Sequence, residues 1–154
     1  MKLAISEAKL AGKKDEVPIG AVLVDKQSKI IASGHNQTIT LNDPTAHAEI
    51  LTLRKAGLKI LNYRLLNTTL YVTVEPCIMC MGAIIHARVS KVVFGAGDPK
   101  WGGAGSLYDF AKDARLNHSP DIISCVCENE CRILIKGFFK AKRNQAANQN
   151  VVQL

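Results

Sequence analysis

Apolar positions in the first part of the chain change from helical spacing to the pattern of paired strands. Apolar residues at helical spacing predict a first helix over residues 2–12, which ends at Gly12 and the charged run after it. The β-branched run IGAVLVD (19–25) is followed by a polar KQSK turn and by IIASGHNQT (30–38). This order is typical of a β-hairpin. Three more strands are predicted from apolar and β-branched runs, at 69–75, 90–95 and 121–126.

Helices are predicted between these strands from their start signals. Asp43-Pro44-Thr45 predicts a helix start, with Asp43 or Thr45 as N-cap and Pro44 in the first turn, and the helix should end near Gly57. Pro76 should open the next helix, and a long helix over 128–143 should follow the last strand. Strands that alternate with helices predict an α/β architecture with helices on both faces of one sheet.

The length predicts a single domain. The chain has 154 residues, and we expect residues 1–143 to form this domain. The segment 144–154, NQAANQNVVQL, is polar and is expected to fray as a C-terminal tail.

The net charge of the chain bears on the kind of partner that it binds. The chain carries 20 Lys and Arg against 13 Asp and Glu, a net charge of +7. Such an excess favours a polyanion as partner, although an ordinary basic surface has the same composition.

The chain has five cysteines, and their number indicates whether the protein belongs in an oxidising or a reducing compartment. The odd number and the lack of a signal peptide argue against a disulfide framework, and no run approaches the roughly 20 apolar residues of a membrane span. A cytoplasmic protein with reduced thiols is therefore expected. Cys125, Cys127 and Cys131 are open to interpretation as a second metal site, but we favour apolar core positions for all of them.

Two short motifs carry candidate chemistry, His47-Ala48-Glu49 and Pro76-Cys77-Ile78-Met79-Cys80. Cys77 and Cys80 share a helix face in a first turn, where the helix dipole favours the thiolate that binds metal. His47 would complete a set of three protein ligands with one open position, which is the pattern of catalytic zinc. Zinc held in this way lowers the pKa of water from about 15.7 to about 7 and so supplies hydroxide at neutral pH.

Glu49 is the candidate proton carrier. Residues two apart do not share a helix face, so His47 and Glu49 can converge only if the metal lies beyond the N-terminus of their helix. A carboxylate there could take a proton from water and deliver it to a ring nitrogen and a leaving amine. Taken alone, the CxxC motif could be a thioredoxin-like redox pair and the HxE motif a surface coincidence. Their joint occurrence, each at a helix start, favours the catalytic zinc site.

A candidate nucleic-acid surface lies near the C-terminus. Cations and aromatic residues are interleaved there, as single-stranded binding requires, at Lys136, Phe138, Phe139, Lys140, Lys142 and Arg143. The alternative is a core-facing Phe pair on a solvated basic helix, and we expect one of the two Phe residues to face the core. The Gly-rich loop 97–106 lacks the GK[ST] end of a P-loop, so nucleotide binding of that type is set aside.

HAE followed by PCxxC resembles the signature of the zinc-dependent nucleobase deaminases. The resemblance runs from about Ala4 to Arg143 and is greatest to the bacterial tRNA adenosine deaminases. The stretches that carry it are EVPIGAVLV, DPTAHAEI, LYVTVEPCIMC, FGAGDPK, GAGSL and GFFKAKR, of which the last three favour the tRNA branch. Trp101-Gly102-Gly103 departs from the pattern where the family varies.

The resemblance implies a three-layer α/β/α sandwich with a five-stranded mixed sheet of the cytidine-deaminase type. It implies a homodimer that converts adenosine to inosine at the wobble position of a tRNA anticodon, with one zinc ion per chain. His47, Cys77 and Cys80 would bind zinc, and Glu49 would move the proton. Asn36 would hydrogen-bond the flipped base with help from the Ala48 backbone. The RNA surface would include Lys100, Phe139, Lys140, Lys142 and Arg143.

Two other functions stay open at this point. A deaminase of free guanine or cytosine would have the same two motifs, although it would have no use for the basic C-terminal helix. A non-catalytic RNA-binding or accessory subunit with a structural metal would have no need of Glu49.

Overall fold

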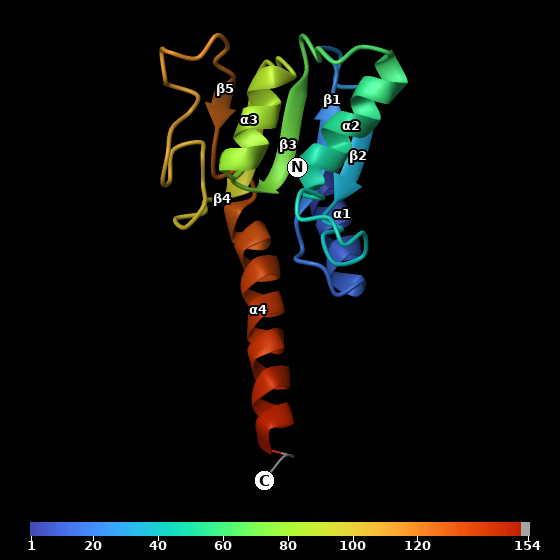
Figure 1. Ribbon diagram of the computed structural model, residues 1–154, viewed down its shortest axis with the longest axis vertical. Coiled ribbons are helices and arrows are strands. Elements are labelled where there is room, and N and C mark those ends of the chain that lie inside the picture. Colours follow the sequence, from blue (N-terminus) through green and yellow to red (C-terminus); the bar gives the residue numbers. More distant parts are fainter. Residues whose placement is uncertain (152–154) are drawn as a thin grey trace.

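In the computed structural model, which describes residues 1–151, one sheet lies between two layers of helices (Figure 1). The strands follow the chain as β1 (Gly20–Val24), β2 (Ile30–His35), β3 (Thr69–Val74), β4 (Lys91–Ala96) and β5 (Asp121–Ile123). The helices are α1 (Lys2–Lys13), α2 (Ala48–Ile60), α3 (Ile78–His86) and α4 (Glu128–Val151). The predicted α/β/α sandwich with five strands is confirmed.

The order of the strands brings four strand ends to one edge of the sheet. The order is β2-β1-β3-β4-β5, with β1 antiparallel to both neighbours and β3, β4 and β5 parallel to one another. Strands β2, β3, β4 and β5 therefore end at the same edge. Ligand sites of open α/β sheets form at the carboxyl ends of their strands, so this edge is the expected place for a site.

The two helical layers pack closely because small residues face them. Helices α2 and α3 cover one face of the sheet, and α1 and α4 cover the other (Figure 1). A Cβ atom on Gly20 would lie 2.1 Å from the carbonyl oxygen of Ala4 in α1. A Cβ atom on Gly95 would lie 2.4 Å from Cys131 Sγ in α4. At both points the strand backbone lies directly against the helix, with no room for a side chain on the strand.

The last helix extends beyond its predicted end. Residues 128–143 were expected to be helical, but α4 continues to Val151 and projects past the edge of the sheet (Figure 1). The segment after Arg143 contains neither Gly nor Pro, so nothing in its sequence interrupts the helix. The fraying of the tail stays a prediction, and residues 152–154 lie outside the described part of the chain.

Candidate metal centre and substrate groove

Helix α2 carries the first metal-ligand candidate, and it begins later in the chain than the sequence signal predicts. Asp43 Oδ1 accepts hydrogen bonds from the backbone N–H and the hydroxyl of Thr45, both at 2.7 Å. This turn uses the Asp43 side chain before the helix begins, so the prediction of Asp43 or Thr45 as N-cap is wrong. His47 is the N-cap instead, with extended backbone (φ −72°, ψ 154°), and α2 begins at Ala48.

The two cysteines lie at the start of α3. The N-cap is Cys77, with φ −72° and ψ 174°, and Cys80 is buried in the first turn. The backbone N–H of Met81 donates to the Cys77 carbonyl at 2.8 Å, which closes that turn. Both thiols therefore point past a helix N-terminus, where the helix dipole stabilises negative charge.

Tertiary structure brings the three predicted ligands together. His47 Nδ1 lies 3.7 Å from Cys77 Sγ and 3.5 Å from Cys80 Sγ. A tetrahedral ion with Zn–S bonds of about 2.3 Å and a Zn–N bond of about 2.05 Å requires N···S separations of about 3.6 Å. The donor set and its spacing therefore fit zinc. No other group of three such ligands is found within residues 1–151.

The charges of the two thiols depend on each other. The pKa of Cys77 is lowered to about 4 by hydrogen bonds from Cys80 and His47, which outweigh the effect of burial. The pKa of Cys80 is raised, because its proton is shared with Cys77 and because the thiol is buried. Hydrogen bonding to Cys77 raises the pKa of His47. A cation among the three donors would remove the need for these protons, because thiolate and neutral imidazole are the forms that bind metal.

Glu49 lies beside this group, in the first turn of α2. Its side chain is 3% exposed, and burial raises its pKa to about 7. The charges of His47 and Cys77 and the Cys80 thiol all act on this carboxyl group. The histidine and the glutamate thus meet at the helix start, as the argument from their spacing requires.

Asn36 approaches α2 from the end of β2. Its Oδ1 accepts a hydrogen bond from the Ala48 backbone N–H at 2.8 Å, and its side chain is buried. The Ala48 carbonyl accepts from the Thr52 hydroxyl at 2.7 Å. Both backbone groups of Ala48 are therefore used inside the protein. The bond to Ala48 orients Asn36 so that its NH₂ group is the part available to a ligand.

Glu75 is a residue of the site region that sequence reasoning missed. This buried carboxylate accepts from the backbone N–H groups of Asp98 (3.0 Å), Ala104 (2.9 Å) and Ser106 (3.0 Å), and from the Ser106 hydroxyl. Gly102 pairs with Cys77 in an isolated β-bridge. The Gly-rich loop is thus attached to the segment that carries a zinc ligand. The signal was available in LYVTVEP, where a lone carboxylate ends an otherwise apolar strand.

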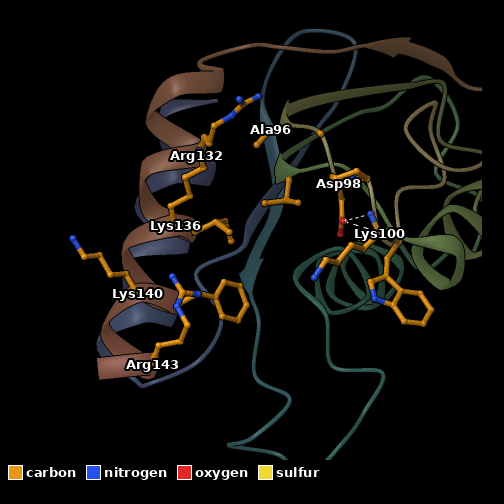
Figure 2. Close-up of a pocket in the computed structure, with 13 residues that line it drawn as sticks. Ala96, Asp98, Lys100, Arg132, Lys136, Lys140 and Arg143 are labelled. Atoms are coloured by element: carbon orange, nitrogen blue, oxygen red, sulfur yellow. Dashed lines mark hydrogen bonds between the residues drawn. The ribbon is translucent and has the colours of Figure 1, made fainter. Parts of the chain in front are cut away.

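A groove of about 1090 Å³ lies between the Gly-rich loop and α4, and we call it the basic groove. Val74, three residues before Cys77, and Trp101, next to the Gly102 that pairs with Cys77, form part of it, so the groove lies near the segment that carries a zinc ligand. Figure 2 shows Lys100 reaching from the loop toward α4, along which the other cations follow one another. Its cationic and aromatic residues are Lys100, Trp101, Arg132, Lys136, Phe139, Lys140 and Arg143.

Lys142 is the one predicted RNA-binding residue that lies elsewhere. Its ammonium group pairs with Asp15 and lies 5.7 Å from the centre of the Phe138 ring. Phe138 is half-buried, whereas Phe139 is 44% exposed in the basic groove. The Phe pair is thus divided between a half-buried and a groove-facing position, in line with the expectation that one of the two packs against the protein.

The remaining cysteines do not behave as one group. Cys131 is buried against β4, as predicted, but Cys125 and Cys127 are exposed, so their predicted core positions are wrong. The reason is that β5 ends at Ile123. The following loop then passes through left-handed backbone at Cys125 (φ 64°) and Cys127 (φ 57°), which turns both residues away from the core.

Fold and site together define a class of protein. A sandwich that presents one His and two Cys ligands beside a buried glutamate has the arrangement of the zinc-dependent nucleobase deaminases. Residues 1–96 match the family model described as the cytidine and deoxycytidylate deaminase zinc-binding region. The chain belongs to this deaminase family.

Within the family, the most informative similarities are to enzymes of tRNA. The chain is 48% identical to the tRNA-specific adenosine deaminase of Haemophilus influenzae, over 94% of this chain and 84% of that relative. A solved tRNA:A34 deaminase structure, from a study of A-to-I editing at the wobble position of transfer RNA, superposes with a TM-score of 0.84. It is 46% identical and covers 87% of this chain and 96% of that one. The Bacillus subtilis guanine deaminase is more distant, with a TM-score of 0.60 and 34% identity over 93% of this chain and 90% of that one.

Proposed function

We propose that this chain is a zinc-dependent hydrolytic deaminase that converts adenosine to inosine at the wobble position of a tRNA anticodon. The observation that carries the choice of substrate is the basic groove beside the zinc ligands. A polyanion needs such a groove, whereas a free purine or pyrimidine base does not. The 46–48% identity to tRNA adenosine deaminases, against 34% to a guanine deaminase, supports the same choice.

The proposed roles follow from the positions of the side chains. His47, Cys77 and Cys80 hold zinc, which supplies a hydroxide nucleophile at neutral pH when bound. Glu49 would take one proton of the attacking water and deliver it to the ring nitrogen, and would then carry the second proton of that water to the amine, which leaves as ammonia. Asn36 donates its NH₂ group to an acceptor on the base, because its oxygen is already bonded to Ala48.

The basic groove would bind the nucleotides next to the reacting one. A base of a single-stranded loop leaves its stack at a lower cost than a base in a duplex, so a loop adenosine can enter the site. Lys100, Lys140 and Arg143 would contact phosphates, and Phe139 would contact a base. Lys142 is assigned no RNA contact, since it pairs with Asp15.

We also propose that the chain forms a homodimer through the outer face of α2 and α3. A second groove, of about 930 Å³, lies there and is lined mainly by apolar residues. Leu58, Leu61 and Tyr63 are 78%, 91% and 71% exposed on this face. Exposed apolar side chains that line one groove together, unlike ones scattered singly, are typical of an interaction surface. Thr45 and Met79 also line the groove, so a second copy seated there would lie beside the zinc ligands.

Light scattering should give a dimer for the wild type and a monomer for Leu58→Glu. A monomeric wild type would contradict the proposal.

The proposed location is the cytoplasm, where tRNA is available and exposed thiols such as Cys125 stay reduced. The described helices include none that is long and apolar enough to cross a membrane.

One assay separates the proposed substrate from the alternatives. Zinc-loaded protein is incubated separately with total tRNA, free guanine, free cytosine and adenosine, and ammonia release is measured. We expect release from tRNA only, with inosine formed in the anticodon loop. Release from a free base alone would show a deaminase of small substrates instead.

Glu49→Gln is the matched control for chemistry. Gln has nearly the shape of Glu but cannot accept the proton, so zinc and fold should remain while turnover is lost almost completely. If this variant kept as much as about a tenth of the wild-type rate, Glu49 would not be the proton carrier. If the wild type also deaminated nothing, the reading as a non-catalytic subunit would replace this proposal.

A further inference from the structure

The single tryptophan of the chain lies in an unusual place. Trp101 belongs to the Gly-rich loop, lines the basic groove and is 64% exposed. Tryptophan is highly buried on average in folded proteins, and an exposed one in a groove is typical of a binding surface. Trp101 does not pack in the hydrophobic core, so its exposed position in the groove indicates a role in binding a ligand.

The loop holds Trp101 firmly rather than leaving it mobile. The Asp98 carboxylate accepts from the backbone N–H groups of Lys100 (2.9 Å) and Trp101 (3.2 Å), and the Asp98 carbonyl accepts from Gly102 (2.9 Å). The Asp98 N–H itself donates to the buried Glu75 at 3.0 Å. A side chain presented by a fixed turn loses little conformational entropy when a ligand binds to it.

Close packing leaves this turn few alternatives. A Cβ atom on Gly102 would lie 2.5 Å from both the Asp98 carbonyl oxygen and the carboxyl carbon of Glu75. The backbone of the residue next to Trp101 therefore lies directly against the buried carboxylate.

The opposite wall of the groove has complementary chemistry. Phe139 of α4 is 44% exposed, and the cations shown on α4 in Figure 2 accompany it. Among the described residues that line the groove, Asp98 alone is acidic, and its carboxylate already accepts from backbone N–H groups. Aromatic faces beside a track of cations are what single-stranded nucleic acids require, because bases stack while phosphates pair with charge.

We propose that Trp101 is a base-stacking residue of this groove, which receives an unpaired nucleobase adjacent to the one that enters the metal site. This rests on the proposed function, since it assumes that the groove holds RNA. The stacked base fixes the position of the strand at the mouth of the site, and the lysines and arginines hold its phosphates.

The single tryptophan allows a direct test on the zinc-loaded wild type. A labelled RNA hairpin with inosine in its loop, which cannot be deaminated, is titrated while label anisotropy and tryptophan emission are both recorded. We expect tryptophan emission to fall over the concentration range in which the hairpin binds. Trp101→Ala should weaken binding about tenfold, since stacking on an aromatic side chain is worth about 1–3 kcal/mol per base. Trp101→Phe should stay within about threefold of the wild type.

Kinetics with the adenosine hairpin separate binding from chemistry. Trp101→Ala should raise KM and leave kcat nearly unchanged, because zinc and Glu49 are untouched. Ile133→Ala, an exposed apolar residue of α4 that does not line the groove, is the control and should change neither parameter. Zinc content and circular dichroism of each variant establish that it is folded.

Three outcomes would overturn the inference, and each is distinct. A hairpin that binds without changing tryptophan emission, and binds equally to Trp101→Ala, would remove the stacking role while leaving RNA binding intact. A hairpin that does not bind at all would remove the proposed function as well. Equal quenching by polyglutamate would assign the groove to an acidic peptide.

Discussion

Replacement of Glu75 by Gln tests whether a buried carboxylate organises the loop beside the metal site. The Glu75 side chain is 3% exposed, and both of its oxygens accept hydrogen bonds from the loop. A glutamine oxygen can still accept from the N–H groups of Ala104 and Ser106. Its NH₂ group would then face the N–H of Asp98, which loses its acceptor, and only the Ser106 hydroxyl could turn to accept from that NH₂ group.

The cost can be worked out from these contacts. A hydrogen bond to a charged group contributes about 1.5–3 kcal/mol, and a donor left unsatisfied costs a similar amount. We expect the free energy of unfolding to fall by about 2–3 kcal/mol. For a chain of this length, each kcal/mol lowers Tm by about 2–4 °C, so Tm should fall by about 5–10 °C. Ser106→Ala removes one such hydrogen bond without leaving a donor unpaired, so its cost should lie at the lower end of about 1.5–3 kcal/mol.

Urea unfolding followed by circular dichroism measures the change, with the same saturating zinc for each protein because bound metal adds stability. Hydrogen exchange then locates it. In Glu75→Gln, the Asp98 amide should exchange faster, while the Ala104 and Ser106 amides stay protected. If Glu75→Gln unfolded within about 0.5 kcal/mol of the wild type and Asp98 kept its protection, the proposed clamp would be wrong.

Three further predictions concern zinc, packing and RNA. Metal analysis should find about one zinc per wild-type chain and almost none in Cys80→Ala; two per chain would revive a second site among the other cysteines. Gly20→Ala places a Cβ atom against α1 and should lower the unfolding free energy by at least about 1–3 kcal/mol, measured by calorimetry; an unchanged Tm would mean that α1 moves aside freely. Replacement of Lys140 and Arg143 by Ala should raise KM for tRNA and reduce the salt slope of log kcat/KM by about 0.7–0.9 for each lost phosphate contact, whereas Lys142→Ala should not; identical salt curves for all variants would argue against RNA in this groove.

Much of this molecule follows from short stretches of sequence. Apolar spacing and turn residues predicted all the strands and helices, because these signals depend on neighbours within a few residues. The HAE and PCxxC motifs identified His47, Cys77 and Cys80 for the same reason. The cysteine pair lies within one helical turn, and its preference for thiolate comes from that turn.

Other features depend on residues far apart in the chain. The early end of β5, a strand that pairs with β4 about 30 residues earlier in the chain, exposed Cys125. Lys142 pairs with Asp15, at the other end of the chain, and so left the predicted RNA surface. No local pattern contains such information, because each contact is formed only when separate elements pack together.

The site itself required the order of the strands. Because β1 is antiparallel to its neighbours β2 and β3, and β4 is parallel to β3, the ends of β2, β3 and β4 meet at one edge of the sheet. That edge brings Asn36 to Ala48 and the Gly-rich loop to Glu75. The local sequence determined which residues could bind zinc and move a proton. The topology decided that they lie at one edge of the sheet near the basic groove, since only the folded sheet brings its strand ends to a common edge.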